Sequence, residues 1–522
     1  MVALKAGPDR TLGSSNDLNL LLDKTPWYRN TQLFKVDAIS LSIILLSSSV
    51  GYDGSLLNGL QALNQWVVFM EHPSSVWLGF VNAIYWIGAF VSALPAPYIA
   101  NRYGRKPGIL IGYVFLIAGA VLQTAARNKT EFLISRLLIG LCVGWMNSSA
   151  PLLLNENAYP SHRSIVSALY MCGFYMGAVI SSWVTYGARN YGSSWCWRLP
   201  SVFQLLLPLC ALPGILWSPE SVRWLISMDR VEEARRVIAN LHAGNDENAL
   251  LVNYEMAEIT ETIREENEAF ESASYAEMLR TPGNRKRLFI SATLGIFSQW
   301  SGNGVISYYL SMVLNSIGIT NTDHQLLISA CLQIWNLLFA IGGALSVNLF
   351  GRRKLFLLSA GIMLVSYVLV TAFSGSFATT GSTSTGVAVI PFLFIYFAGY
   401  DIAMTPLIVA YPVEIWPFRL RSRGIIVTWL TTICAMLFNT FVNPIALSAI
   451  GWRYYLVFVA VLVVFAFTVF FAYPETRGFS LEQMAIVFDG DDAAVSRNPM
   501  ERALNEMDAE DSKATTAELE EL

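Results

Sequence analysis

The chain alternates long apolar stretches with short polar loops, and each stretch has the length of one membrane crossing. A hydrocarbon layer is crossed by about 20 mainly apolar residues in a helix, because only there do the backbone polar groups satisfy one another. With 54% hydrophobic and 14% charged residues, the chain has more apolar surface than a water-soluble domain could bury. The sequence predicts twelve spans, at about 37–60, 77–99, 108–127, 131–152, 163–186, 198–217, 287–316, 325–349, 354–374, 387–412, 424–447 and 452–472.

One long polar stretch, from Ser218 to about Arg287, separates six spans from the other six. It is rich in charged residues that favour helix, as in Val231–Arg236. The predicted fold is therefore an all-α membrane protein with two six-helix bundles. The predicted parts are an N-terminal segment (1–36), the first bundle (37–217), a helical linker (218–286), the second bundle (287–472) and an acidic tail (473–522).

Basic residues concentrate in alternate loops, such as those at Arg102, at Arg163 and at Arg352. The positive-inside rule places these loops, the linker and both termini in the cytoplasm. The first 35 or so residues lack the basic start, short apolar run and small-residue cleavage site of a secretory signal, so the first span is expected to stay as an anchor. We expect a multi-pass protein of the plasma membrane.

Charged motifs recur in the same order in the two halves. Gly104-Arg105-Lys106 recurs as Gly351-Arg352-Arg353-Lys354, and Glu156 with Arg163 recurs as Glu414 with Arg423. Pro219-Glu220-Ser221 recurs as Pro474-Glu475-Thr476. Three pairs at nearly one spacing indicate a duplicated six-helix unit.

Two similar bundles can rock about a site between them, and ion pairs between the bundles at their cytoplasmic ends could hold one state closed. The alternative is that these charges only set the orientation of the chain in the membrane and contact lipid headgroups. The matched repetition favours a gate. The predicted gate residues are Arg102, Arg105, Glu156, Arg163, Glu220, Arg352, Arg353, Glu414, Arg423 and Glu475.

The motifs also carry a family resemblance. They are Asn101–Lys106, Arg136 with Gly140 and Gly144, Pro219–Leu225, Tyr411–Ile415 with Arg423-Gly424, and Pro474–Gly478. As a set, they resemble the signatures of the sugar porter family of the major facilitator superfamily. Gly51–Ser55, Gln299–Gly304 and Tyr400–Leu407 are most similar to fungal lactose permease-like transporters. The resemblance implies twelve helices and transport of a sugar, often with a proton.

The seventh span has the side chains that a sugar site needs, which are hydroxyl-matching amides beside aromatic faces. Gln299, Asn303 and Tyr308 supply polar groups, and Trp300 could stack on a sugar ring. The alternative is a packing seam between helices, which explains the glycines of this span but not its amides. Two weaker candidates in other spans are Asn336 and Asn439.

This span departs from the hexose-porter pattern, in which two glutamines stand where this chain has Ser298 and Gln299. In the tenth span, Val409 takes the place of a tryptophan. The sequence therefore favours a β-linked disaccharide or a galactose-like sugar over glucose.

Two acids, Asp53 and Asp401, lie deep in spans, and intramembrane carboxylates are functional candidates by default. Arg136 is expected at a depth similar to that of Asp53. In proton-coupled members of the family, the matching acid and arginine form the proton-coupling pair, which the resemblance extends to Asp53 and Arg136. Asp401 is the competing proton carrier, and a static buried ion pair is the structural alternative.

We therefore expect a sugar transporter, most simply a proton symporter that functions as a monomer, and not an enzyme. Its expected partners are a small sugar, a proton and the lipid bilayer. The net charge of −4 gives no reason to expect nucleic acid, and the six cysteines show no metal-ligand spacing. No cofactor is expected. The alternatives are a sugar receptor that does not transport and an uncoupled facilitator.

Overall fold

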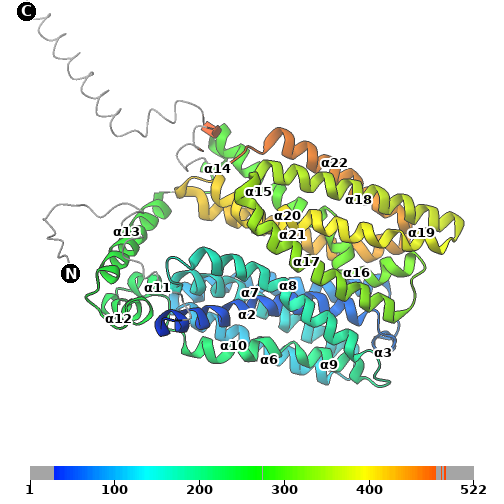
Figure 1. The fold of residues 1–522 in the computed structure, drawn as a ribbon, viewed down its shortest axis with the longest axis horizontal. Coiled ribbons are helices and arrows are strands. Elements are labelled where there is room, and N and C mark those ends of the chain that lie inside the picture. Colours follow the sequence, from blue (N-terminus) through cyan, green and yellow to red (C-terminus); the bar gives the residue numbers. More distant parts are fainter. Residues whose placement is uncertain (1–28, 273, 478–483, 485–486, 490–522) are drawn as a thin grey trace, which may run out of the picture. The chain divides into compact units, whose positions relative to one another are not determined.

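The computed structural model describes residues 29–272, 274–477, 484 and 487–489. Over these residues, the chain is helical and has no β-strand (Figure 1). The helices are α2 Thr31–Leu60, α3 Asn64–Phe69, α4 Ser75–Ala93, α5 Pro95–Tyr103, α6 Arg105–Ala125, α7 Lys129–Asn157, α8 Arg163–Ala188, α9 Trp195–Phe203, α10 Leu206–Trp217, α11 Val222–Ser227, α12 Val231–His242, α13 Leu250–Ser272, α14 Glu277–Arg280, α15 Pro282–Trp300, α16 Asn303–Ser316, α17 Thr322–Phe350, α18 Arg352–Thr380, α19 Thr383–Val387, α20 Val389–Ile415, α21 Phe418–Ile450, the 3₁₀ turn η1 Gly451–Tyr454 and α22 Tyr455–Ala472.

Ten ranges of the described residues are long and apolar enough to cross a membrane. One of them, Arg419–Ala472, contains both α21 and α22, and so holds the predicted eleventh and twelfth spans. The predicted seventh span is not among the ten, since it is divided between α15, which has basic residues in its first turns, and the short α16. The arrangement is consistent with twelve crossings.

Some predicted spans are interrupted helices. The predicted span 77–99 is divided between α4 and α5, where Pro95 starts the second helix. Proline has no N–H and clashes with the preceding turn, which favours a new start over a continuous helix. The predicted span 198–217 is likewise divided into α9 and α10 at Gln204 and Leu205.

The chain forms two compact units. Unit 1 comprises Met1–Asn267, Val305–Leu337 and Thr440–Ala449. Unit 2 comprises Glu268–Gly304, Leu338–Asn439 and Ile450–Leu522. Unit 1 therefore includes two segments, 305–337 and 440–449, from the part of the sequence predicted as the second bundle.

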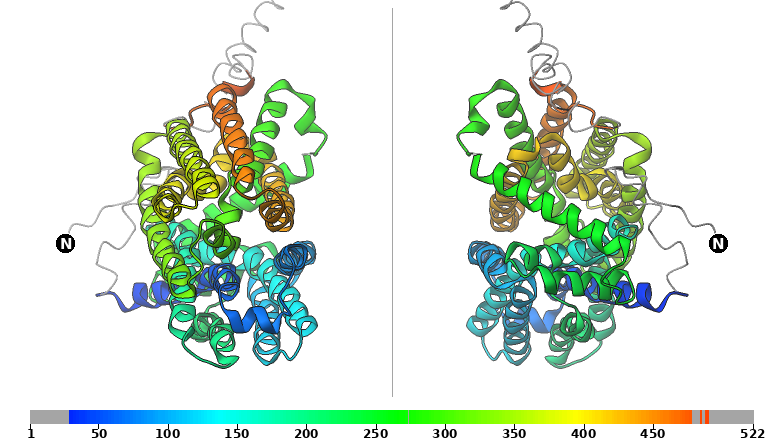
Figure 2. Two further views of the ribbon diagram at one scale, coloured as in Figure 1. Left: turned by 90° about the vertical axis from the view of Figure 1, so that its right-hand side faces the viewer. Right: turned by 90° about the vertical axis from the view of Figure 1, so that its left-hand side faces the viewer.

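In unit 1, long helices lie side by side and are seen nearly end-on in Figure 2. Glycines set the closest approaches. A Cβ added to Gly51 of α2 would meet the backbone of Phe174 in α8, and one added to Gly177 of α8 would meet the backbone of Ser48 in α2. Small residues bring helix backbones together in this way in membrane bundles. In the same way, a Cβ added to Gly140 of α7 would meet the backbone of Tyr85 in α4.

The predicted linker contains α11 to α14, and its first helices have an apolar core of their own. Trp224 and Leu225 of α11 pack with Ile238 of α12 and with Val252 and Met256 of α13. A second joint is polar: His242 Nδ1 of α12 lies 2.7 Å from Glu255 Oε2 of α13, and both side chains are buried. The linker helices are thus packed together and not merely tethered.

In unit 2, aromatic rings join α18, α20 and the end of α22. Tyr411 stacks on Tyr473 with ring centroids 5.5 Å apart, and Phe356 meets both edge-on. The hydroxyl of Tyr411 donates to the carbonyl of Pro474, 2.8 Å away. This core holds the residues after α22 beside the ends of α18 and α20, where the charged motifs of this unit lie.

Candidate functional site

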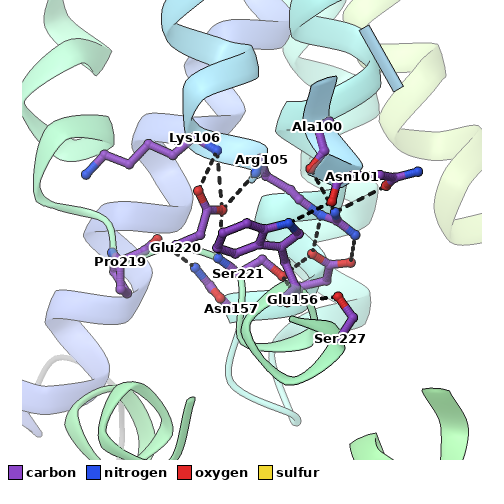
Figure 3. Close-up of polar contacts among 11 residues, drawn as sticks. Ala100, Asn101, Arg105, Lys106, Glu156, Asn157, Pro219, Glu220, Ser221 and Ser227 are labelled. Carbon is purple, nitrogen blue, oxygen red and sulfur yellow. Dashed lines mark hydrogen bonds and ion pairs between the residues drawn. The ribbon is translucent and has the colours of Figure 1, made fainter. Parts of the chain in front are cut away.

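The carboxylate of Glu220 ties the start of α6 to the start of α11 (Figure 3). It accepts hydrogen bonds from the backbone N–H groups of Arg105 at 2.9 Å, Lys106 at 3.1 Å and Ser221 at 2.9 Å. A helix start presents free N–H groups, and a carboxylate is favoured there. Burial raises the pKa of Glu220, although these N–H groups and the Arg105 charge oppose that rise.

The side chain of Arg105 points the other way, toward the end of α7. Its Nε lies 3.2 Å from Glu156 Oε2 and its Nη2 lies 3.3 Å from Glu156 Oε1, so the ion pair is two-pronged. Glu156 also accepts a hydrogen bond from the hydroxyl of Ser221. The end of α7 and the starts of α6 and α11 are thereby held in one polar cluster, which we call the unit 1 charge cluster (Figure 3).

Unit 2 contains the same construction, which we call the unit 2 charge cluster. Glu475 accepts the N–H groups of Arg352 at 2.8 Å and Arg353 at 3.2 Å. The guanidinium of Arg352 binds Glu414, with Nη2 at 2.8 Å from Oε1. Thr476 takes the place of Ser221 and donates to Glu414 Oε2 at 2.5 Å. The repeated sequence motifs therefore form matching hydrogen bonds and ion pairs in the two units.

A glycine makes each cluster possible. Gly104 and Gly351 have φ values of 110° and 87°, which L side chains rarely adopt. A Cβ added to Gly104 would also meet the carboxylate of Glu220, and one added to Gly351 would meet that of Glu475. Each glycine turns the chain so that the next helix presents its first N–H groups to the acid.

The structure also gives the settings of the four other predicted gate arginines. Arg102, in the last turn of α5, and Arg163, the first residue of α8, are both exposed. Arg353 donates from Nη2 to the carbonyl of Phe470 at 2.5 Å. Arg423 is buried, and its guanidinium lies 5.3 Å from the ring centre of Tyr275.

The repeated charges predict ion pairs between the two bundles. In the described residues, Arg105 instead pairs with Glu156 within unit 1, and Arg352 pairs with Glu414 within unit 2. Each pair joins neighbouring helix ends of its own unit. The reason is local, because each glycine turn places its arginine directly over the end of the helix that carries the acid.

The predicted coupling pair, Asp53 and Arg136, is in contact inside unit 1. Nη1 of Arg136 in α7 lies 2.5 Å from Oδ1 of Asp53 in α2, and both side chains are almost completely buried. The guanidinium also lies 4.8 Å from the ring centre of Tyr85 in α4. The second carboxylate oxygen, Oδ2, has no hydrogen-bond partner among the described residues. Oδ2 of Asp53 can therefore accept a proton or a hydrogen bond while Oδ1 pairs with Arg136.

Asp401, the competing carboxylate, is fully buried in α20 of unit 2. Its Oδ1 accepts a hydrogen bond from the hydroxyl of Thr405, one helical turn later, at 3.0 Å.

The glycines of the predicted seventh span mark a real break between α15 and α16. Gly302 has φ of 108°, and its carbonyl accepts the hydroxyl of Tyr367 at 2.7 Å. On the α15 side, the hydroxyl of Tyr400 donates to the carbonyl of Ser298 at 2.9 Å. Tyrosine hydroxyls from α18 and α20 thus satisfy carbonyls beside the break, as non-helical backbone inside a membrane requires.

Four of the six predicted sugar residues gather around this break in unit 2. Asn439 donates to the carbonyl of Gln299 at 2.8 Å, and Asn303 donates to the hydroxyl of Tyr400 at 3.2 Å. Trp300 donates to the carbonyl of Ala435 at 3.2 Å. The amide oxygen of Asn303 has no hydrogen-bond partner among the described residues.

The other two predicted sugar residues, Tyr308 and Asn336, belong to unit 1. Asn336 is buried in α17, and its Nδ2 lies 3.4 Å from Oε1 of Gln333. Tyr308 lies in α16, and its carbonyl accepts a hydrogen bond from Gln61. The structure thus divides the predicted sugar residues between its two units.

Sequence reasoning missed several residues that hold these elements. Ser221 and Thr476 were visible as part of a repeated motif, but their bonds to the acids were not. Asn58 and Gln61 of the α2 end gave a weak signal, as two amides three residues apart at the end of an apolar span. Among the described residues, no group of three or more His, Cys, Asp or Glu side chains is placed to hold a metal ion.

Comparison with known proteins agrees with this fold and these motifs. Residues 39–488 match the family described as "Sugar (and other) transporter". The "MFS-type transporter oryC" of Aspergillus oryzae is 28% identical over 515 residues, which are 95% of this chain and 95% of that protein. The "Sugar transporter STL1" of Saccharomyces cerevisiae is 30% identical over 460 residues, 84% of this chain and 79% of that protein.

A solved structure has the same fold. The inward open conformation of the xylose transporter XylE from E. coli superimposes with a TM-score of 0.71 at 22% sequence identity, covering 87% of this chain and 100% of that chain. Lactose does not occur in these three names, so the predicted nearness to lactose permease-like transporters is not confirmed by them.

Proposed function

This chain belongs to the sugar (and other) transporter family, and we propose that it carries a neutral sugar across a membrane together with a proton. The proposed architecture is twelve membrane helices in two six-helix bundles that expose the site to each side in turn. The ten candidate ranges, one of them holding two helices, and the break between α15 and α16 support that count.

We further propose that the protein lies in the plasma membrane with both termini, the linker and both charge clusters in the cytoplasm. The support is the distribution of basic residues, which lie at the loops of the two clusters and along the linker. The proposed functional unit is a monomer.

The observation that carries proton coupling is the buried pair of Asp53 and Arg136, with one carboxylate oxygen left over. An ionisable group inside a membrane helix is costly and is usually retained for function. A nearby arginine favours the anion, and its withdrawal favours the protonated acid. Movement of α7 relative to α2 during the cycle would therefore let Asp53 take up and release a proton.

We propose that the sugar is held at the break between α15 and α16. Gln299 and Asn303 offer amides there, and the unsatisfied oxygen of Asn303 supplies an acceptor for a sugar hydroxyl. Trp300 and Asn439 border the same break, and Tyr308 and Asn336 of unit 1 remain proposed sugar contacts. The substrate class is a mono- or disaccharide, with the altered α15 and Val409 favouring a disaccharide or a galactose-like sugar.

The first test is uptake of labelled mono- and disaccharides by yeast that lacks its own sugar carriers, with external pH recorded at the same time. A symporter gives saturable uptake together with alkalinisation of the medium. Uptake without alkalinisation would identify an uncoupled facilitator. Sugar binding without uptake of any member of the panel would identify a receptor.

The second test assigns the proton. Asp53→Asn should abolish uphill accumulation and sugar-induced alkalinisation while leaving sugar exchange partly intact, because an amide mimics the protonated acid. Asp401→Asn serves as the matched variant in the other unit. Normal alkalinisation with Asp53→Asn, together with its loss in Asp401→Asn, would move the carrier to Asp401.

A further inference from the structure

Helix α16 is bent, and the bend lies at Tyr309. This residue has φ of −136° and ψ of 28°, which is not helical. A non-helical residue interrupts the ladder of backbone hydrogen bonds around it, so the groups on either side need other partners. Tyr309 and Leu310 are almost completely buried, so water is a poor substitute.

Two amide side chains at the end of α2 supply those partners, Asn58 in its last turn and Gln61 directly after its last residue. Oδ1 of Asn58 accepts the N–H of Leu310 at 3.1 Å, just after the bend. Nε2 of Gln61 donates to the carbonyl of Tyr308 at 2.9 Å, just before it. Asn58 and Gln61 are three residues apart and share one face at the end of α2. The end of α2 thus supplies an acceptor for the N–H group after the bend and a donor for the carbonyl before it.

A third bond fixes the side chain at the bend itself. The hydroxyl of Tyr309 donates to the carbonyl of Thr440 in α21, 2.5 Å away. Pro444, one turn later in α21, lacks the N–H that would bond this carbonyl in a regular helix. All of these residues belong to unit 1, so the three bonds hold the bent α16 within one compact body.

The part of α16 that follows the bend lies beside a cavity. A cavity of about 250 Å³ is lined by Gln61 and by Ser311 and Asn315 of α16, among others. Close-packed interiors resist movement of a helix, whereas a cavity beside it removes part of that resistance. The bonds made by Asn58 and Gln61 therefore add to the packing that buries Tyr309 and Leu310, on the side where the helix has the cavity beside it.

We propose that Asn58 and Gln61 are positioning residues for transport. They hold α16 in its bent form against the end of α2, and they release it when these two helices separate there during the transport cycle. We call the two amides the α16 clamp. The inference rests on the proposed transport function, but the clamp itself is a property of the structure. Neither residue is assigned contact with sugar or proton.

The first measurement is independent of sugar. Hydrogen exchange of the backbone amides in 308–313 is followed by mass spectrometry on the purified full chain in lipid nanodiscs. Asn58→Leu removes the acceptor for Leu310 and should speed exchange in this segment about tenfold, since a buried amide without its partner loses of the order of one hydrogen bond. Asn58→Asp keeps an acceptor oxygen and should keep the protection.

The matched control is Gln123→Leu, which removes another fully buried amide of unit 1, in α6. It should leave exchange in 308–313 unchanged. Gln61→Met is a second clamp variant at a half-buried position and covers the case in which Asn58→Leu does not fold. Unchanged exchange in the clamp variants, or equal acceleration in Gln123→Leu, would overturn the proposal.

The second measurement is tracer transport of whichever sugar the uptake panel identifies. Asn58→Leu should lower the maximal rate about tenfold with KM changed less than about twofold, because the clamp affects the helix position and not the sugar contacts. Equal loss in Asn58→Asp and Asn58→Leu would show that Asn58 acts in some other way. Altered exchange in a chain that transports no sugar would retain the clamp and reject the proposed function.

Discussion

Removing the charge of Glu414 should slow transport without weakening sugar binding to the same degree. In Glu414→Gln, the side chain keeps its shape but can no longer form the ion pair with Arg352, whose Nη2 lies 2.8 Å away. The hydroxyl of Thr476 also loses its charged acceptor. The change thus disables the unit 2 charge cluster at its centre.

The expected magnitude follows from how buried the pair is. Exposed ion pairs contribute about 0–1 kcal/mol, and loss of one partner from a fully buried pair costs about 3–5 kcal/mol. The side chains of Arg352 and Glu414 are 14% and 25% exposed, which lies between these cases. We therefore expect about 2 kcal/mol, which corresponds to a shift of about 30-fold between a state that contains the cluster and one that does not.

The cluster is remote from the predicted sugar contacts in the same unit. Ile415, next to Glu414, accepts a hydrogen bond from Arg287 near the start of α15. Gln299 lies about 18 Å further along α15 at about 1.5 Å per residue. A direct effect of Glu414→Gln on a sugar hydroxyl is excluded by that separation.

The assay compares two quantities for purified protein in liposomes: the maximal rate of tracer uptake and the equilibrium dissociation constant for the sugar. The rate should fall about 30-fold and the dissociation constant should change less than about threefold. Arg419→Gln is the control, because its pair with Glu277 is more exposed and lies in the same unit. The reasoning is refuted if equilibrium binding is lost as severely as transport.

Two further predictions concern stability. Asp489→Asn should lower the thermal unfolding midpoint in detergent by an amount corresponding to about 3 kcal/mol, because it leaves the buried guanidinium of Arg287 without its two-pronged acid; an effect no larger than that of the exposed control Lys286→Gln would contradict this. Burial raises the pKa of Glu220 in the folded state above its ordinary value of 4.5. The contribution of this carboxyl group to the free energy of unfolding is therefore complete below pH 4.5, and it is lost as the pH rises through the pKa of the folded state. Glu220→Gln should remove that part of the pH dependence of the midpoint, and an unchanged profile would refute it.

The sequence predicted the helices well where apolar runs have clear limits. The predicted span at 325–349 corresponds to α17, and that at 354–374 lies within α18. The break in the seventh span also has a local signal, because Gly302 can adopt the positive φ with which the backbone leaves the helix there. Such features depend on residues close together in the chain.

What the sequence did not reveal depends on contacts between distant residues. The bend at Tyr309 has no glycine or proline of its own and relies on Asn58, which lies in another helix. The partner of Arg105 was not evident either, since repeated charges show that a motif matters but not which acid it meets. Hydrogen bonds across helices decide both features, and a single sequence does not record them.

The two halves of the sequence agree at their charged ends and differ in their first helices, and that difference follows the proposed division of function. Arg105 and Glu156 in unit 1 have the same geometry as Arg352 and Glu414 in unit 2, including a glycine with positive φ before each arginine. In contrast, α2 is one continuous helix that carries Asp53, whereas the corresponding segment of the second half is divided into α15 and α16. A continuous helix holds a carboxylate at a fixed depth beside Arg136, while a broken one lets its two parts move separately. The duplicated clusters therefore suit a task that both halves share, and the unlike first helices suit proton coupling in one half and sugar-dependent movement in the other.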